Sequence, residues 1–213
     1  MTRNRIPGMA LARTALRSIA AATLLVVLPA VASAQAITFT YTGVTASGSV
    51  GGTNFVRKDF TITSTGNVAS RQSLSGGYFI DHLAASISIV GVGTYNFLTG
   101  TRTFVSNNGL IAGFSRAGAG GSDLYYAPSN AAFSSWDMTT SIGTFTGTSP
   151  LLQWSSPAIQ TDGGTLAFDD SQISSTFRAV VGTTSTVPEP SSYALMASGL
   201  IAITVFSRRR RKV

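Results

Sequence analysis

The sequence has 213 residues, no cysteine and a formal net charge of +7, from 15 basic and 8 acidic residues. The lack of cysteine excludes a disulfide-stabilised fold and a cysteine-ligated zinc site. Most of the positive charge lies near the two ends, whereas residues 35–187 contain six basic and seven acidic residues. Nucleic-acid binding requires a basic surface, and this central region has a formal charge of −1. We therefore expect no nucleic-acid partner.

Residues 1–34 have the three parts of a secretory signal peptide. Four arginines precede an apolar run over residues 19–31, and small residues follow at Ala32 and Ala34. This order is typical of a signal peptide. A permanent membrane anchor is the less favoured alternative, because the apolar run is short. We expect signal peptidase to recognise Ala32 and Ala34 and to cleave before Gln35, so that the remainder is exported.

The central region, residues 35–182, has the composition of an all-β domain. It is rich in glycine, serine and threonine and contains no glutamate, and 20 of the 22 glycines fall between residues 35 and 187. Such a composition supplies turns and strand surfaces but few strong helix formers. About ten short strands at close spacing predict an antiparallel β-sandwich or jelly roll.

Several expected strands follow from alternating or β-branched sequence. Ile37, Phe39 and Tyr41 alternate with threonines, which is typical of a half-buried strand. The turn sequence Asn107-Asn108-Gly109 predicts a type I′ hairpin. The remaining expected strands cover residues 54–63, 78–90, 94–97, 101–105, 110–115, 124–127, 139–146, 151–154, 165–168 and 174–181.

Candidate catalytic residues are few. His82 is the sole histidine, and its neighbour Asp81 would point to the opposite side of a strand, which disfavours a Ser-His-Asp triad. Glycoside hydrolysis needs paired carboxylates, and the adjacent pair Asp169-Asp170 would also face opposite sides. Calcium binding near Asp162 and this pair is less favoured than solvated turn residues. We expect no enzyme activity, no cofactor and no metal site.

Aromatic residues leave one binding hypothesis open. Trp136 and Trp154 are candidate contacts for a carbohydrate, because sugar rings stack on exposed aromatic side chains. The alternative is that both belong to the hydrophobic core, where large aromatic residues usually lie. The sequence alone does not separate these two interpretations.

Residues 183–213 contain a linker and three features in a fixed order. Val187-Pro188-Glu189-Pro190 is followed by an apolar run over residues 193–206. The basic residues Arg208, Arg209, Arg210, Arg211 and Lys212 come next. As a helix the apolar run would reach about 21 Å at about 1.5 Å per residue, which is short for a bilayer core of roughly 30 Å. The basic cluster favours the cytoplasmic side, so we expect a single, marginal transmembrane helix with the central domain outside.

This order resembles the PEP-CTERM sorting signal of Gram-negative bacteria, which a membrane protease-transpeptidase called exosortase recognises. The resemblance covers residues 187–213. It implies an exported protein that is tethered to the inner membrane, cleaved near Pro188-Glu189-Pro190 and released to the cell surface or the extracellular matrix. Families with this tail are associated with exopolysaccharide and biofilm material. We therefore expect a non-enzymatic structural or adhesive protein; a secreted carbohydrate-binding module and, less favoured, a secreted hydrolase are the alternatives.

Overall fold

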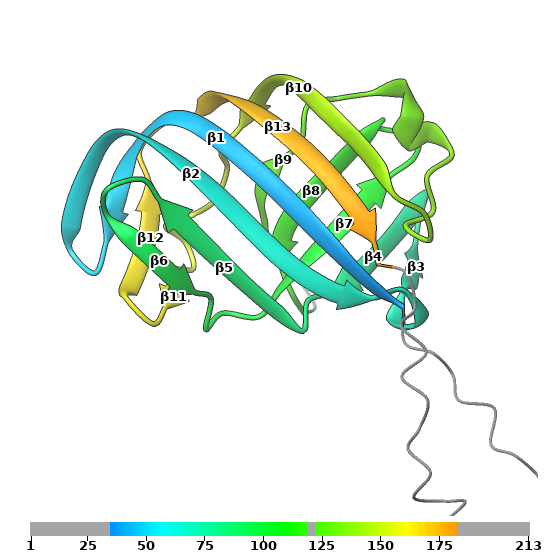
Figure 1. Ribbon diagram of the computed structural model, residues 1–213, viewed down its shortest axis with the longest axis horizontal. Helices are drawn as coiled ribbons and strands as arrows, with labels where there is room; N and C mark the ends of the chain where they lie inside the picture. The colour runs from blue at the N-terminus through cyan, green and yellow to red at the C-terminus, as the bar shows by residue number, and fades with distance from the viewer. Residues whose placement is uncertain (1–34, 119–121, 183–213) are drawn as a thin grey trace, which may run out of the picture. The chain divides into compact units, whose positions relative to one another are not determined.

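The computed structural model describes residues 35–118 and 122–182, and these form β-strands and two short 3₁₀ turns (Figure 1). The expected signal peptide and the expected transmembrane segment lie outside the described residues. The 3₁₀ turns are η1 (Val68–Ser70) and η2 (Ala131–Ser134). The strands are β1 (Ala36–Val50), β2 (Thr53–Asn67), β3 (Gln72–Leu74), β4 (Gly77–Asp81), β5 (Ala84–Ile89), β6 (Gly93–Asn96), β7 (Thr101–Ser106), β8 (Ile111–Arg116), β9 (Asp123–Tyr126), β10 (Ile142–Pro150), β11 (Ile159–Thr161), β12 (Gly164–Phe168) and β13 (Gln172–Val181).

The strands form two antiparallel sheets, which confirms the all-β prediction. The larger sheet has eight strands in the order β10-β13-β1-β2-β5-β6, with β12 paired to β1 and to β11. The smaller sheet has five strands in the order β3-β4-β7-β8-β9. Figure 1 shows the smaller sheet behind the long strands β1, β2 and β13. A single hydrophobic core joins residues from both sheets.

Strands β1 and β2 are each 15 residues long and form the centre of the larger sheet. The predicted alternation of β1 is confirmed, since Ile37, Phe39 and Tyr41 are fully buried. The register between the two strands shifts near Ala46. Thr45 and Arg57, with φ of 57° and 49°, have left-handed backbone there. Because bulges bend a strand, the first part of β1 pairs with β13 and its last part with β12.

The outward positions of the larger sheet carry hydroxyl side chains. Cross-strand pairing places one such row across six strands, and two of its neighbouring pairs are hydrogen-bonded through their hydroxyls. Threonine suits this position because it combines a β-branched shape with a polar group. The row consists of Thr146, Thr176, Thr42, Thr61, Ser88 and Thr94.

One end of the larger sheet closes into a ring. The amides of Leu98 and Thr99 donate to the carbonyl of Gln160 at 2.9 and 3.1 Å. The amide of Asp162 donates to the carbonyl of Asn96 at 3.0 Å. These bonds link the end of β6 to β11, and β11 pairs with β12, which pairs with β1. Strands β1, β2, β5, β6, β11 and β12 therefore form a small barrel at this end.

The structure corrects several local expectations. The expected strand over residues 78–90 is two strands, β4 and β5, which belong to different sheets and are separated by His82 and Leu83. The hairpin between β7 and β8 is confirmed, but its turn is not type I′. That turn needs positive φ at both central residues, whereas in the four-residue loop Leu110 alone, at 55°, has positive φ. Residues 151–154 form no strand beyond an isolated bridge at Leu151.

The described domain begins and ends at the same place. The amide of Gly182 donates to the carbonyl of Ala36 at 2.8 Å. The side chain of Gln35 donates to the carbonyl of Gly182 at 3.4 Å. The chain therefore enters and leaves the domain side by side, next to η1.

Candidate functional site

His82 lies between the two sheets in a cluster of hydroxyl groups. Its Nδ1 is 2.9 Å from the hydroxyl of Thr101, and its Nε2 is 2.9 Å from Thr103 and 3.0 Å from Ser64. Tyr41 extends the cluster, because its hydroxyl contacts that of Thr103 at 3.0 Å. Ser64 and Tyr41 belong to the larger sheet, whereas Thr101 and Thr103 belong to the smaller one. The cluster therefore joins the two sheets through side-chain hydrogen bonds.

Burial keeps this histidine neutral. His82 lies 5.4 Å from the ring of Phe114, in a stacked arrangement, and 5.7 Å from the ring of Phe39. Desolvation lowers the pKa of His82 to about 3, because burial disfavours the charged form. Ser64, the one serine bonded to it, is 1% exposed. The pair resembles a nucleophile and a base in distance, but the hydrogen-bond partners of His82 are hydroxyls rather than a carboxylate.

Both candidate tryptophans lie in the hydrophobic core. Trp136 is 4% exposed and Trp154 is 1% exposed. The indole of Trp136 donates to the carbonyl of Thr140 at 2.9 Å and packs against Phe133 and Phe177. Neither indole presents an open face on which a sugar ring could stack. The structure thus supports the core interpretation of the two residues.

Trp154 continues the stack that begins at His82. Its ring is nearly parallel to that of Phe114, with centroids 6.5 Å apart, and Phe114 stacks on His82. Arg116 holds the loop that carries this tryptophan, since its guanidinium donates to the carbonyls of Gln153, at 2.6 Å, and of Pro157. Trp154 therefore separates the interior around His82 from the outer loop.

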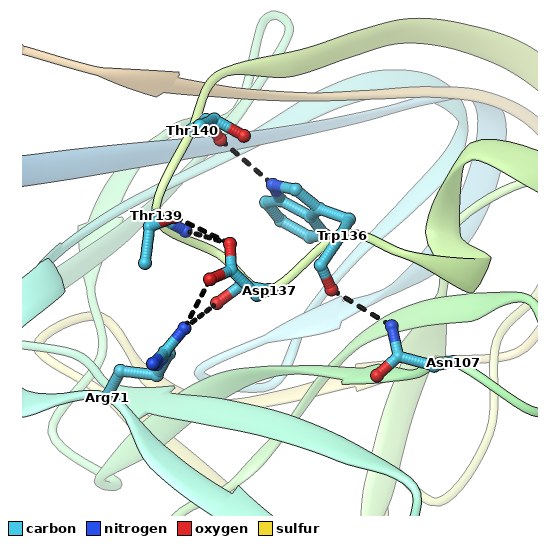
Figure 2. A network of polar contacts seen from close by, with 6 residues as sticks. All are labelled: Arg71, Asn107, Trp136, Asp137, Thr139 and Thr140. Atoms are coloured by element: carbon cyan, nitrogen blue, oxygen red, sulfur yellow. Dashed lines mark hydrogen bonds and ion pairs between the residues drawn. The ribbon is translucent and has the colours of Figure 1, made fainter.

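A network of polar contacts fixes the segment between η2 and β10, and Figure 2 shows it from close by. Arg71 donates to the carboxylate of Asp137 at 2.6 Å and to its carbonyl at 2.8 Å. The amide and hydroxyl of Thr139 also donate to this carboxylate. Asn107 donates to the carbonyl of Trp136 at 2.9 Å (Figure 2). The segment carrying Trp136 is thereby held against the smaller sheet.

The same contacts determine the ionisation of Asp137. Burial raises the pKa of the Asp137 carboxyl, but hydrogen bonds from Thr139 and the nearby Arg71 outweigh burial and bring the pKa below its ordinary value. The carboxylate is therefore charged and fully engaged within the fold. We interpret this network as structural.

The other aspartates do not converge. Both carboxylate oxygens of Asp162 accept hydrogen bonds from Asn96, at 2.9 and 2.7 Å. Asp170 accepts from the amide of Ser47, and Asp59 accepts from the amide of Thr45 at 2.9 Å. Among residues 35–118 and 122–182, no group of three histidine or acidic side chains could hold a metal ion. These carboxylates instead satisfy backbone groups at turns and bulges.

The open end of the small barrel contains a cavity of about 670 Å³. Three turns surround it, between β1 and β2, between β5 and β6, and between β11 and β12. Lys58 is the single charged residue among the described residues that line it. The lining residues are Val50, Gly51, Thr53, Asn54, Phe55, Val56, Lys58, Gly91, Val92, Tyr95 and Gly163. We call this cavity the barrel mouth.

A second, smaller cavity of about 350 Å³ lies beside β3 and the turn between β7 and β8. Tyr78 lines it, and the guanidinium of Arg71 lies 4.6 Å from the centre of that ring. The other lining residues are Leu74 and small or amide residues, without a charged group among the described lining residues. It offers fewer means of recognising a ligand than the barrel mouth.

The barrel mouth was not predicted from the sequence. Its local signals in the sequence are the glycines at its turns, Gly51-Gly52 and Gly163-Gly164, which by themselves indicate turns and no cavity. The closure of β6 onto β11 brings these turns together, and it joins residues more than 60 positions apart. The hydroxyl cluster around His82 was missed for the same reason.

Comparison with known proteins identifies the end of the chain and not the domain. No curated protein and no solved structure matches the chain. Among the described residues no helix is long and apolar enough to cross a membrane, and the span expected at residues 193–206 lies outside them. Residues 186–211 match a family model described as the PEP-CTERM protein-sorting motif. The chain thus carries a PEP-CTERM sorting motif, which implies export, anchoring in the membrane and processing by exosortase.

Proposed function

We propose that the chain is a non-enzymatic structural or adhesive protein of the cell surface or extracellular matrix, associated with exopolysaccharide. The observation that carries this proposal is the match of residues 186–211 to the PEP-CTERM sorting motif. Signal peptidase would remove residues 1–34, and the segment over residues 193–206 would hold the protein transiently at the inner membrane. Exosortase would then cleave near Pro188-Glu189-Pro190 and release the β-domain.

The β-domain supports a role without catalysis. Its sole histidine is neutral and hydrogen-bonded to three hydroxyl groups. Asp137, Asp162 and Asp170 are each engaged by other groups of the fold. A general acid or base must reach the proton that it transfers, and these side chains are committed to the fold instead.

The test is the mass of the secreted protein in the producing bacterium. The extracellular form should lack the cluster from Arg208 to Lys212. A variant with Pro188→Ala, Glu189→Ala and Pro190→Ala should stay in the membrane fraction and retain that cluster. Thr183→Ala with Thr184→Ala, which lies just before the matched residues, is the control and should be processed normally. Intact basic residues on the extracellular wild-type protein would contradict the proposal.

A further inference from the structure

The barrel mouth has the size and lining of a small-molecule site. Its volume of about 670 Å³ lies within the range of roughly 300–1,000 Å³ that is usual for ligand pockets. The mouth of a β-barrel is also one of the places where such sites occur preferentially. The lining combines apolar, aromatic, hydroxyl and amide groups with one ammonium group. A ligand that fits must therefore be amphipathic and of modest charge.

Tyr95 gives the mouth a fixed aromatic wall. A side chain at Gly163 would lie 2.2 Å from the ring of Tyr95, and one at Gly93 would lie 2.6 Å from its hydroxyl, so the ring packs directly on these two glycines. The hydroxyl of Tyr95 donates to the carbonyl of Val92 at 3.3 Å. Because backbone holds the ring on one side, its position is set before any ligand arrives, which lowers the entropic cost of binding.

Apolar surface extends this wall towards the rim. Val56 is 67% exposed and lines the mouth. Val90, in the neighbouring turn, is 62% exposed. Exposed valines of this kind contribute little to the stability of the fold, but they can cover the C–H face of a bound sugar ring. Thr53 and Asn54 add a hydroxyl and an amide to the same lining.

Lys58 places one ammonium group in the lining of the mouth. Ion pairs among the described residues involve Arg71 with Asp137 and Arg102 with Asp81, so Lys58 takes part in none of them. Asp59 and Asp162 flank the mouth in sequence, but neither is among its lining residues, and their carboxylates accept hydrogen bonds from Thr45 and Asn96. One unpaired ammonium group in a partly enclosed cavity attracts an anion. The charge of that anion should be −1, since a phosphate dianion would be only half neutralised.

We propose that the barrel mouth binds a uronic acid residue of an acidic polysaccharide. The sugar carboxylate pairs with Lys58 in a charge-assisted hydrogen bond. Thr53 and Asn54 receive sugar hydroxyls, and the apolar face of the ring packs on Tyr95 and Val56. A neutral sugar would fill the same volume but would leave the ammonium group desolvated and unpaired, which costs free energy.

The place of the mouth in the domain suits this role. Figure 1 shows the turn between β1 and β2 at the end of the sandwich opposite to the meeting point of β1 and β13. Gln35 and Gly182 are hydrogen-bonded at that meeting point. The mouth thus lies at the end of the domain opposite to Gly182, the last described residue before the sorting segment.

The test is isothermal titration calorimetry of the full-length chain in a non-ionic detergent, with tetragalacturonate as the probe. Maltotetraose, a neutral glycan of equal length, and inorganic sulfate are the comparison ligands. Tetragalacturonate should bind more tightly than either. Lys58→Gln should weaken its binding about tenfold, the effect of losing roughly one charge-assisted hydrogen bond. Lys58→Arg should restore most of the affinity. Tyr95→Leu should weaken the binding of tetragalacturonate but not that of sulfate.

Arg178→Gln is the matched control, because it removes one exposed positive charge on β13 outside the mouth. It should leave the affinity unchanged. Equal binding of maltotetraose and tetragalacturonate, equal losses in Lys58→Gln and Arg178→Gln, or no binding at all would each overturn the proposal. Sulfate binding as tight as that of tetragalacturonate would reduce the site to a simple anion site. None of these outcomes bears on the mass of the secreted protein, so the two proposals fail separately.

Discussion

His82 and Lys58 are both basic side chains without a carboxylate partner among the described residues, but their surroundings differ. His82 lies between the sheets, stacked on Phe114 and bonded to three hydroxyls, and it is neutral. Lys58 borders an open cavity, where its charge can be compensated by solvent or a ligand. His82 is thus accommodated between the two sheets as a neutral base. Lys58 instead faces a space that a ligand can fill.

The largest expected effect comes from truncating the aromatic stack next to His82. Trp154→Ala removes the outer ring of the stack over Phe114 and His82. We expect a loss of about 3–5 kcal/mol in the free energy of unfolding, because large-to-small substitutions in a core leave a cavity. Urea denaturation followed by circular dichroism would measure it. Leu152→Ala, in the same loop but partly exposed, is the control and should cost clearly less. Equal losses for both variants would show that the loop, rather than the stack, is what matters.

The next effect is an acid sensitivity that arises from His82. Its pKa is about 3 in the folded protein and about 6.5 when unfolded. Between these values the unfolded chain binds the proton and the folded protein does not, so stability falls as the pH decreases. The loss should approach about 1.4 kcal/mol per pH unit, or about 2–3 kcal/mol at pH 4.5. Stability curves from pH 7 to pH 4 would show it.

His82→Gln separates this contribution from that of the carboxylates. Glutamine keeps a hydrogen-bonding side chain for Thr101 and Thr103 but does not titrate. The variant should be less stable at pH 7 and should lose less stability on acidification than the wild-type protein. Parallel pH profiles for the two proteins would mean that His82 does not titrate as the buried cluster requires.

The smallest effects on stability are expected for substitutions of two surface cations, Arg71 and Lys58. Arg71→Gln breaks the ion pair with Asp137 and the contact over Tyr78. We expect it to cost about 0.5–1 kcal/mol, because both partners are partly exposed. Lys58→Gln should change the free energy of unfolding by less than about 0.5 kcal/mol. Thermal unfolding of the three proteins at one salt concentration would measure both values. A larger cost for Lys58→Gln would reveal a partner in the fold and would weaken the case for a ligand.

The local sequence pattern was sufficient to predict a strand where alternation alone defines the buried face. The alternation of Ile37, Phe39 and Tyr41 with threonines predicts one buried face, and this face is buried in the structure. The run over residues 78–90 shows the limit of this reasoning. It is rich in residues that favour strands, but the chain passes from one sheet to the other at His82 and Leu83. Which sheet receives a strand depends on its partners, which lie far away in the sequence.

The candidate sites show the same difference between local and long-range information in the sequence. The sorting motif is a contiguous segment, so the sequence alone was sufficient to predict it, and its match to residues 186–211 confirms the prediction. The role of His82 depends on Ser64 and Thr103, which come from β2 and β7. The barrel mouth depends on the bonds between Asn96 and Asp162. Neither the His82 cluster nor the barrel mouth can be recognised from one contiguous segment. The burial of the two tryptophans likewise depends on packing partners from other parts of the chain.

Gln35 and Gly182, the two ends of the described domain, are hydrogen-bonded to each other, and this affects how the domain bears a mechanical load. A pull on the chain after Gly182 acts along β13, which pairs over most of its length with β1 on one side and β10 on the other. If a polymer holds the opposite end of the domain, the load runs parallel to these strands. The hydrogen bonds of both ladders are then sheared together instead of being opened one after another. Such an arrangement resists traction on a tethered protein, because many bonds must break at once before the strand moves.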